Sequence, residues 1–593
     1  MRRGKVNKLR INLLENYIKF FLDVLQCTER AEPGRKACIG CACAKRSMPS
    51  DLASEASEEN RRFCAAMPAE GAREARKTGG FAQLCPQKEQ SERGKPKVLR
   101  SYAHRRSKGS EENRRFCEAM LEEEEGKRGN RKVLRGYACR KGRKGIAMRE
   151  LTELIRADMR PALGVTEPGA IAFAVASAKS HVAGEVKKVH VALNSGMYKN
   201  AFTCGIPNSS HFGNLYAAAL GAVAADAKKG LESLDAVTPK DDALAEQMVA
   251  DGKIEVVLDH IGSEITIDAR VETETDNCVV SIRGSHTNII QIVKNGICIW
   301  QMKEDEKEEA KEEPKKAAGA FAGADCSGMG AGTDIPVIHR YTLAQILSYV
   351  REVPAEEIAF IGDAFTMNLE LLQEGIRSKR TTITPMLLQE NGQELISENA
   401  QSTAQLLCNG AIEARVLGLS RPAMSITGSG AHGIIATMPL YAYAKVHKDR
   451  VSEEALLRAT ALSYLITMYI KEYSGKLSAF CGCGIAAGTG MACGLAYLQD
   501  ADEEAYTNVI QNMASGLTGM ICDGGNHGCA MKGIVAVDAA FRAADMAKKG
   551  ICIENIHGIN GRTPEDTMRY MGMIASPGMV ETEKTIVEIM EQK

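Results

Sequence analysis

The sequence predicts an α+β protein in which an N-terminal α+β domain is followed by a mostly α-helical domain. Apolar and polar residues alternate, as they do in strands, only before about residue 300, whereas helical spacing of apolar residues prevails after residue 334. Aromatic residues make up 5% of the chain while Ala, Gly and Met are plentiful, which favours closely packed helices over an all-β design. A chain of 593 residues is also too long for one core, so we expect several domains.

Residues 1–147 are a poor candidate for a folded domain. They carry an excess positive charge of roughly +16, which the rest of the chain balances, since the totals are 75 Lys and Arg against 75 Asp and Glu. Two short segments recur at unequal spacing and so do not describe a stacked repeat protein: 58–64 as 111–117, and 97–103 as 132–138. Because little apolar periodicity is available to build a core, we expect a disordered or artefactual extension, with the true start at Met148.

Two other interpretations of residues 1–147 stay open. One is a basic arm for nucleic acid, which the charge fits but which lacks a recognition helix and interleaved aromatic residues. The other is a small metal module built on Cys38, Cys41 and Cys43, which has no matching downstream pair at zinc-finger spacing. We therefore expect that the protein does not bind nucleic acid.

The chain is predicted to be cytoplasmic, with no membrane partner. No uninterrupted apolar stretch reaches the roughly 18 to 20 residues of a membrane span, and no cleavage site follows the N-terminal apolar patch. The chain has 19 cysteines and no export signal, so we expect reduced thiols, metal ligands or catalytic groups rather than disulfides.

The first ordered domain is predicted to span residues 148–302. Leu151, Ile155 and Met159 have helical spacing, and Pro161 ends that helix. Alternating patterns predict strands at 187–193, 254–258, 265–271 and 279–282, an Ala-rich helix at 215–228, and either a helix start or a strand at 289–293.

A change of composition separates this domain from the next. Residues 303–333 begin with a charge run and continue into Ala and Gly, which is typical of a solvated linker or surface insertion. Residues 334–593 are predicted to be all-α, with Ser452 and Thr563 as helix N-caps and Pro564 at a first helical position. The expected helices cover 341–350, 355–377, 401–417, 453–473, 506–520 and 534–549.

Two glycine-rich turns of the helical domain carry closely spaced cysteines. The first contains Cys481 and Cys483, the second contains Cys522 and Cys529, and each turn adjoins a helix. Glycine lets the backbone approach a bulky cofactor, helix N-termini favour an anionic group, and thiolates are the usual ligands of iron–sulfur clusters. The pattern therefore indicates a metal or cluster site.

Other uses of these turns are compatible with their spacing. Buried free cysteine is a small hydrophobic side chain, which is what we expect of Cys408 and Cys493 within helices. A zinc site is possible, although neither turn has the usual Cys-x2-Cys spacing. A phosphate loop built on Gly482, Gly484 and Gly488 is disfavoured, because that segment follows a helix rather than a strand.

Several further motifs of residues 148–593 are specific when taken together. They are Thr166-Glu167-Pro168, the segment 194–200 (Asn-Ser-Gly-Met-Tyr-Lys-Asn), Gly205-Ile206-Pro207, the segment 428–434 (Gly-Ser-Gly-Ala-His-Gly-Ile), Gly482-Cys483-Gly484 and the segment 522–529. With these motifs the region resembles the L-cysteine desulfidase family, relatives of the α subunit of iron–sulfur L-serine dehydratases.

The resemblance implies a serine-dehydratase-α-like helical domain and a [4Fe–4S] cluster with one iron open to substrate. By motif position its ligands are Cys483, Cys522 and Cys529, with Cys481 as the rival for the first of them. Many relatives have a cysteine directly before the Thr-Glu-Pro triplet, whereas this chain has Val165. If that cysteine is a ligand or a catalytic group, either another group such as Cys204 replaces it or the chemistry differs.

The resemblance also implies an α,β-elimination that converts L-cysteine and water to pyruvate, ammonia and sulfide. The candidates for catalysis are His432, His527 and Glu167, with the two histidines as bases for the α-proton. The candidates for substrate binding are Lys199, Asn200, His286 and Ser429. Each of these residues also has a structural alternative, such as a histidine bonded to backbone or a polar surface turn.

Three other functions stay open. The first is a lyase of the same fold that acts on serine or another β-substituted amino acid, and the second is a non-catalytic iron–sulfur redox or sensor protein. The third is a nucleic-acid binder working through residues 1–147. The expected partner is a small amino-acid substrate, and a homo-oligomer is possible.

Overall fold

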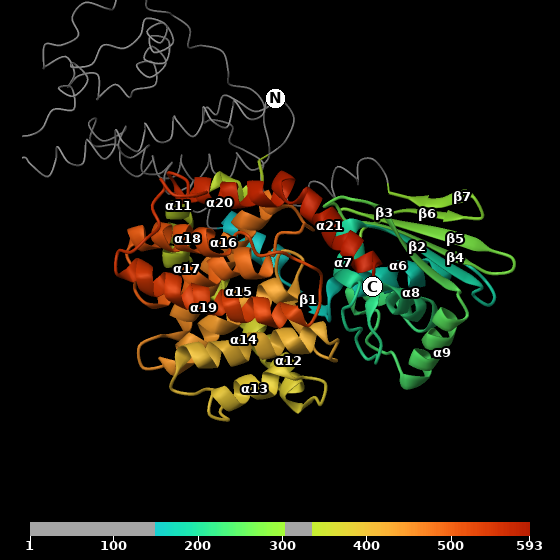
Figure 1. The fold of residues 1–593 in the computed structure, drawn as a ribbon, viewed down its shortest axis with the longest axis horizontal. Helices are drawn as coiled ribbons and strands as arrows, with labels where there is room; N and C mark the ends of the chain where they lie inside the picture. The colour runs from blue at the N-terminus through green and yellow to red at the C-terminus, as the bar shows by residue number, and fades with distance from the viewer. Residues whose placement is uncertain (1–148, 303–334) are drawn as a thin grey trace, which may run out of the picture. The chain divides into compact units, whose positions relative to one another are not determined.

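The computed structural model of the protein describes residues 149–302 and 335–593 (Figure 1). The predictions for residues 1–147, including the two repeated segments and the Cys38 cluster, lie outside the described residues, as does the whole of the predicted 303–333 linker. Within the described part, no helix combines the length and the apolar character that crossing a bilayer requires.

A six-stranded sheet forms the centre of the first region, with strand order β3-β2-β4-β5-β6-β7. Its strands are β2 (Lys188–Asn194), β3 (Ile254–His260), β4 (Thr266–Glu272), β5 (Asn277–Arg283), β6 (Ile289–Lys294) and β7 (Ile297–Gln301). The β2–β3 pair is parallel and all other pairs are antiparallel. The strands predicted by alternation are confirmed, and β6 resolves the ambiguous segment. The edge strand β7 was not predicted, and all five of its residues are exposed.

Helices cover one face of this sheet, because alternate residues of the central strands turn apolar side chains toward them. Val189, Val191 and Leu193 of β2 are buried, as are alternate residues of β4. The covering helices are α6 (Thr166–Lys179) and α8 (Gly213–Val223), while α7 (Ser195–Ala201) and α9 (Pro239–Ala250) complete the crossover between β2 and β3. The predicted helix at 215–228 corresponds to α8, which is shorter. The helix predicted at the start of the domain is confirmed over 149–158.

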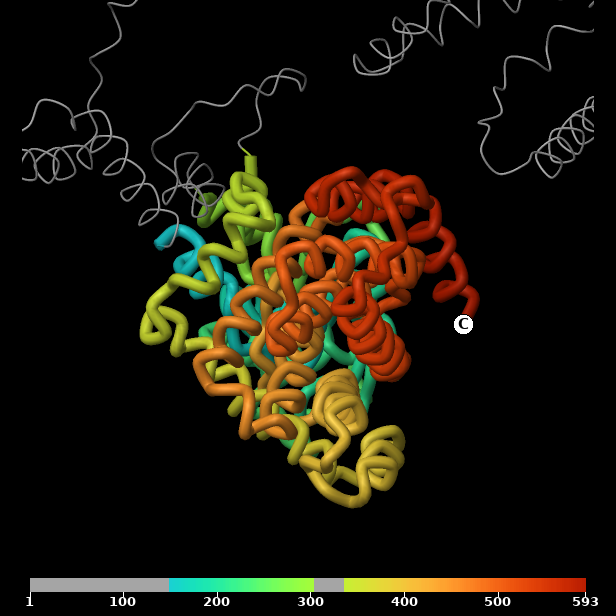
Figure 2. Tube along the Cα trace, turned by 90° about the vertical axis from the view of Figure 1, so that its left-hand side faces the viewer, coloured from blue at the N-terminus to red at the C-terminus, as the bar shows by residue number. Residues whose placement is uncertain are grey.

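The second region is built from helices around a central group formed by α15, α16 and α17. Its helices are α11 (Leu343–Glu352), α12 (Gly362–Arg377), α13 (Ile383–Glu390), α14 (Ala400–Val416), α15 (Gly430–Val446), α16 (Glu453–Ser474), α17 (Gly488–Leu498), α18 (Glu503–Leu517), α19 (Gly528–Lys548), α20 (Pro564–Met573) and α21 (Val580–Glu591). Helix α17 packs against α16 on one side and against α19 on the other, among the orange and red helices of Figure 2. The predicted caps are confirmed, since Ser452 accepts from the N–H of Ala455 and Thr563 from that of Asp566.

Two segments of this region differ from the sequence-based expectation. The helix expected at 355–377 begins as two short 3-10 turns, Ala355–Glu357 and Ala359–Ile361, before α12. The first glycine-rich segment is also not an open turn, because Cys483–Ala487 forms a π-helical turn that runs directly into α17. Such π turns are frequent at functional sites.

A two-stranded antiparallel ribbon joins the two regions, and it corrects the prediction that residues 334–593 are all-α. Its strands are β1 (Arg160–Leu163) and β8 (Pro422–Ser425), with Arg160 opposite Ser425. Strand β1 directly precedes α6, and β8 directly precedes the turn that starts α15. The buried apolar residues of both regions form one continuous core. The ribbon therefore fixes the start of α6 relative to the start of α15.

Candidate functional site

Backbone pairing holds the two cysteine loops side by side. Phe480 and Ile521 form an antiparallel bridge, the Cys481 N–H donates to the Met520 carbonyl at 3.0 Å, and the Cys522 N–H donates to the Ala479 carbonyl at 2.6 Å. Cys481, Cys483 and Cys522 therefore come together, although about 40 residues separate the loops.

Cys529 joins this group from the first turn of α19. Its thiol lies 3.5 Å from the Gly524 carbonyl, and burial raises its pKa to about 11. A hydrogen bond with Cys481 and burial hold the pKa of Cys483 well above its usual range, and the charges of Cys529 and Cys522 add to this. The four thiols thus lie within electrostatic reach of one another, a grouping that we call the thiol cluster.

Within the thiol cluster, Cys481 is the thiol that ionises first. The Cys483 thiol donates to its sulfur, and the Gly484 N–H lies 3.4 Å from it, so the pKa of Cys481 falls to about 6 despite its burial. Cys481 therefore stays a rival of Cys483 as a ligand. As the side chains stand, no three His, Cys, Asp or Glu residues of the described ranges form a group that could hold a metal ion, so the ligand set stays a prediction.

Two lysines that were not predicted from the sequence lie beside the thiol cluster. Lys471, near the end of α16, is buried, which lowers its pKa, while the charges of Cys483, Cys522 and Cys481 act to raise it. Lys532, one turn after Cys529, forms an ion pair with Asp523. Burial opposes its charge, yet the thiols and Asp523 raise the pKa of Lys532 above its usual value.

The two lysines lower the electrostatic cost of ionising the thiols of the thiol cluster. Thiolates repel one another in a buried place, and positive charges nearby lower that cost. Four thiols with two adjacent ammonium groups are therefore a donor set that suits an anionic group bound by thiolates. A sequence signal for Lys532 existed, since position i+3 from Cys529 lies on the same helix face.

A buried carboxylate adjoins the thiol cluster at the start of α6. Glu167 accepts from Asn200 Nδ2 at 2.9 Å, and His286 Nε2 lies 3.8 Å from the same oxygen. Burial alone would raise its pKa, but His286 and Asn200 outweigh burial and lower the pKa of Glu167 to about 2. Glu167 is therefore ionised at neutral pH and is a weak base, and its catalytic role stays a prediction.

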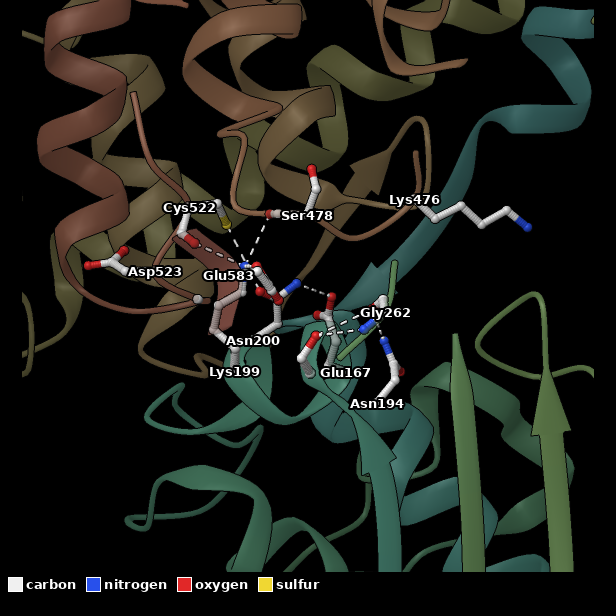
Figure 3. Close-up of polar contacts among 12 residues, drawn as sticks. Glu167, Asn194, Lys199, Asn200, Gly262, Lys476, Ser478, Cys522, Asp523 and Glu583 are labelled. Atoms are coloured by element: carbon white, nitrogen blue, oxygen red, sulfur yellow. Dashed lines mark hydrogen bonds and ion pairs between the residues drawn. The ribbon is translucent and has the colours of Figure 1, made fainter. Parts of the chain in front are cut away.

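Asn200 connects this carboxylate to the thiol cluster. Its amide nitrogen donates to Glu167, and its amide oxygen lies 3.9 Å from the Cys522 sulfur (Figure 3). The loop after Cys522 also follows the backbone at Asn200 closely. Gly524 has φ 103°, and a Cβ there would lie 2.4 Å from the Lys199 carbonyl, so only glycine fits.

Lys199, predicted to bind substrate, has its ammonium group fully occupied by the protein. Its Nζ donates to Glu583 Oε2 at 2.7 Å, to the Cys522 carbonyl at 2.9 Å and to the Ser478 carbonyl at 3.1 Å (Figure 3). Three acceptors use all three donors of an ammonium group. The geometry therefore gives Lys199 a structural role, tying the cysteine loops to α7 and α21.

His432 faces the thiol cluster from the first turn of α15. Its Nδ1 lies 2.6 Å from the Thr427 hydroxyl, and a Cβ at Gly482 would lie 2.5 Å from its Nε2. Burial, together with the charges of Lys471 and Arg415, holds the pKa of His432 well below its usual range. The imidazole is therefore neutral at pH 7, with Nε2 directed at the loop between Cys481 and Cys483.

The turn formed by Thr427 and Gly428 has left-handed backbone angles and positions His432. Thr427 and Gly428 have φ 48° and 74°, and the Thr427 N–H donates to Asp158 at 2.6 Å. Non-glycine residues in the left-handed region are uncommon and often mark functional sites. Ser429 follows as the N-cap of α15, but its side chain makes no capping hydrogen bond.

His527, the second predicted base, is instead exposed and tied to another carboxylate. Its Nε2 lies 2.6 Å from Glu413 Oε1. The Glu413 side chain is fully buried, accepts from the backbone N–H groups of residues 382–384 at the start of α13, and has a pKa of about 2. The structure thus separates the two histidines, with His432 at the thiol cluster and His527 at the α13–α14 corner.

Position 165 lies against the loop that carries Cys522 and Cys529. A Cβ at Gly525 would lie 2.8 Å from Val165 Cγ1, and Val165 is 2% exposed. Cys204 is also buried, and the negative charges of Glu167 and Cys529 add to the effect of burial in raising its pKa. Side chains at positions 165 and 204 therefore lie beside the thiol cluster, where a substitution would change its surroundings.

Comparison with known proteins assigns the chain. The family model "Serine dehydratase alpha chain" matches residues 228–588, more than half of the sequence. The chain belongs to the serine dehydratase alpha chain family. This confirms the predicted relation to the α subunits of serine dehydratases. The family match begins before β3, so it covers part of the sheet region as well as the helical region and lies within the predicted span 148–593.

Similar proteins of several bacteria match this chain over nearly their full length. A "UPF0597 protein" of Clostridium botulinum (strain Langeland) is 39% identical over 443 residues, which are 74% of this chain and 98% of the relative. UPF0597 proteins of Caldanaerobacter subterraneus subsp. tengcongensis and Clostridioides difficile (strain 630) are 34% and 31% identical, and this chain covers 98% of each. The family match includes the thiol cluster, His286 and His432, while Glu167 and Asn200 precede it.

Proposed function

We propose that the protein is a [4Fe–4S]-dependent lyase that converts L-cysteine and water to pyruvate, ammonia and sulfide. The observation that carries this proposal is the thiol cluster, with Lys471 and Lys532 beside it and the Glu167–Asn200 pair adjoining it. A serine dehydratase alpha family member would use such a site for an elimination of the same type, with sulfide in place of water as leaving group.

Cys522, Cys529 and either Cys483 or Cys481 would hold the cluster. When bound with one iron free of protein ligands, it would supply Lewis-acid polarisation of the leaving group. The protein's own part is positional. Lys471 and Lys532 offset the negative charge of the thiolates. Gly482 and Gly484 have no side chain, so the backbone of the first cysteine loop can approach the cluster.

His432 is the base that the geometry favours. A general base must be unprotonated and within reach of the proton that it takes, and His432 is neutral with Nε2 turned to the cysteine loop. Its Nδ1 is fixed by the Thr427 hydroxyl, so the ring keeps one orientation. In this scheme His432 Nε2 takes the α-proton, sulfide leaves from the β-carbon, and the aminoacrylate that forms hydrolyses to pyruvate and ammonia.

The test is anaerobic purification of the full chain, followed by measurement of iron, acid-labile sulfide, and sulfide and pyruvate formed from L-cysteine. Ser substitutions at Cys483, Cys522 and Cys529 should each remove most of the iron, and the Cys481→Ser variant decides between the two rivals. Cys298→Ser, on the exposed strand β7, is the matched control. A well-folded protein without iron would overturn the proposal.

A second candidate is the same elimination with water as leaving group from L-serine. The description of the matching family, serine dehydratase alpha chain, favours it. The ratio of kcat/KM for L-cysteine to that for L-serine separates the two candidates. Bound iron without turnover of either amino acid would instead point to a redox or sensor role.

A further inference from the structure

Arg415 is a buried cation that forms no ion pair within 4 Å with any described residue. It lies in the last turn of α14, it is 4% exposed, and its Nε has no hydrogen-bond partner. Within 149–302 and 335–593, no carboxylate forms an ion pair with its guanidinium. Arginine is almost never fully buried unless it is paired, because an uncompensated buried charge costs several kcal/mol. An anion that comes from outside the protein would remove that cost.

The guanidinium lies directly against the start of α15. A Cβ at Gly430, the first residue of this 17-residue helix, would lie 2.6 Å from Arg415 Nε and 3.1 Å from its Cδ. The first N–H groups of a helix lack internal partners and carry a partial positive charge. The side chain of the N-cap residue Ser429 forms no hydrogen bond with these N–H groups. The helix end and the arginine therefore attract an anion to the same place.

The surroundings of Arg415 belong to the candidate site. Its charge contributes to lowering the pKa values of both Glu167 and His432. His286 Nε2 is a second buried atom without a hydrogen-bond partner, and its ring lies 3.8 Å from where a Cβ of Gly428 would be. Two unsatisfied polar side chains thus flank the turn 428–430, which is also the turn that leads to His432.

We propose that Arg415 and the N-terminus of α15 form the subsite that binds the α-carboxylate of the substrate. This inference rests on the proposed function in one respect, namely that the substrate is an α-amino acid. The charges around the turn 428–430 fit a zwitterionic amino acid, since the cation Arg415 and the anion Glu167 both adjoin this turn. A carboxylate at the start of α15 would place the neighbouring α-carbon beside His432, which is in the first turn of that helix.

The experiment compares two probes that carry no leaving group. L-alanine has the carboxylate, and L-alaninamide replaces it with a neutral amide. Binding of each to the anaerobic full-chain holoenzyme is measured by calorimetry for the wild type, Arg415→Met, Arg415→Lys and Arg421→Met. Arg421 is exposed and six residues further along the chain, so its variant removes the same charge outside the subsite.

We expect the wild type to prefer L-alanine by at least about tenfold, as for a charge-assisted contact. Arg415→Met should lose that preference, Arg415→Lys should keep part of it, and Arg421→Met should match the wild type. A second readout is the thermal midpoint without ligand. It should stay equal or rise in Arg415→Met, because an uncompensated buried charge is removed.

The outcomes separate this inference from the proposed function. A wild type without preference for L-alanine, an Arg415→Met variant that keeps the preference, or a fall of its midpoint by several degrees would each overturn the carboxylate subsite. Turnover of L-cysteine with an unchanged KM in Arg415→Met would also overturn it, while the elimination stands. A preference lost in Arg415→Met without turnover of any amino acid would support the subsite and contradict the elimination.

Discussion

Two regions contact the cysteine loops, and they differ in how far each satisfies its buried cation, Lys199 in one and Arg415 in the other. On the side of α7 and α21, Lys199 reaches three acceptors and leaves no donor unused. On the side of the turn before α15, Arg415 Nε has no hydrogen-bond partner among the described residues, and His286 Nε2 lies 3.8 Å from Glu167 without forming a hydrogen bond. A satisfied group holds the fold together, whereas an unsatisfied group costs free energy and keeps its capacity for a ligand. The comparison supports a structural role for Lys199 in the first region, and it underlies our proposal that the second region binds substrate.

The two histidines give the sharpest test of this comparison, with the largest expected effect. His432→Gln should lower kcat/KM for amino-acid elimination by about 10²- to 10⁴-fold, the usual worth of a general base. His527→Gln should cost less than about tenfold, because His527 is exposed and tied to Glu413. Initial rates of sulfide or pyruvate formation check this, with iron content as control. Comparable losses in both variants would break the comparison.

The region around Lys199 should contribute to the free energy of unfolding. Lys199→Met leaves Glu583 charged and buried, so we expect a loss of about 3 to 5 kcal/mol in the free energy of unfolding, measured in urea. The double variant Lys199→Met with Glu583→Met should recover part of that loss. Lys188→Met, which breaks the exposed pair with Glu255, should cost less than about 1 kcal/mol. If Lys199→Met is as stable as the wild type but binds L-alanine poorly, Lys199 belongs to the substrate site instead.

The carboxylate behind His527 predicts a pH dependence. The pKa of Glu413 is about 2 in the folded protein against an ordinary 4.5, so its stabilisation is complete above pH 4.5 and is lost as the pH falls toward 2. Glu413→Gln should therefore be less stable than the wild type at pH 7 by on the order of 3 kcal/mol. The gap should narrow only below about pH 4.5. Urea midpoints between pH 7 and pH 3 test this, and a gap independent of pH would contradict it.

The smallest expected effect concerns Val165, which packs on the loop between Cys522 and Cys529. Val165→Cys is close to volume-conserving, so it should cost less than about 1.5 kcal/mol of stability. A thiol at this position should slow the loss of cluster absorbance in air, because it offers a further ligand. Val165→Ala is the matched control without a thiol. Equal decay in both variants would show that position 165 does not reach the cluster.

The sequence predicted those elements whose two faces differ in polarity. Strands β2, β4 and β5 alternate buried and more accessible side chains, and helices such as α18 carry a polar face, so their periodicity is visible. Helices α6 and α15 were not predicted, because nearly every residue of each is buried and no polar face marks a period. The pairing of β1 with β8, which lie in different regions of the chain, is likewise set only by tertiary structure.

Within the site, the cysteines and neighbours such as His432 and Asn200 could be singled out from the sequence, but the partners of the buried charges could not. Cys522 and Cys529 stand out because Gly and Cys cluster in the sequence. Lys199 also stood out, but its partner Glu583 lies 384 residues away, so the sequence could not show that its ammonium is occupied. Arg415 was missed for the converse reason, since its lack of a partner is a property of the folded protein.

The β1–β8 ribbon has a consequence for how the site could be assembled. A chain cut between residues 302 and 335 would leave Glu167, Asn200 and His286 on one polypeptide, and the thiol cluster with its helices on the other. Each piece would hold half of the ribbon and half of the site. The site would then become a subunit interface, and its activity would depend on the concentration of both polypeptides rather than on folding alone.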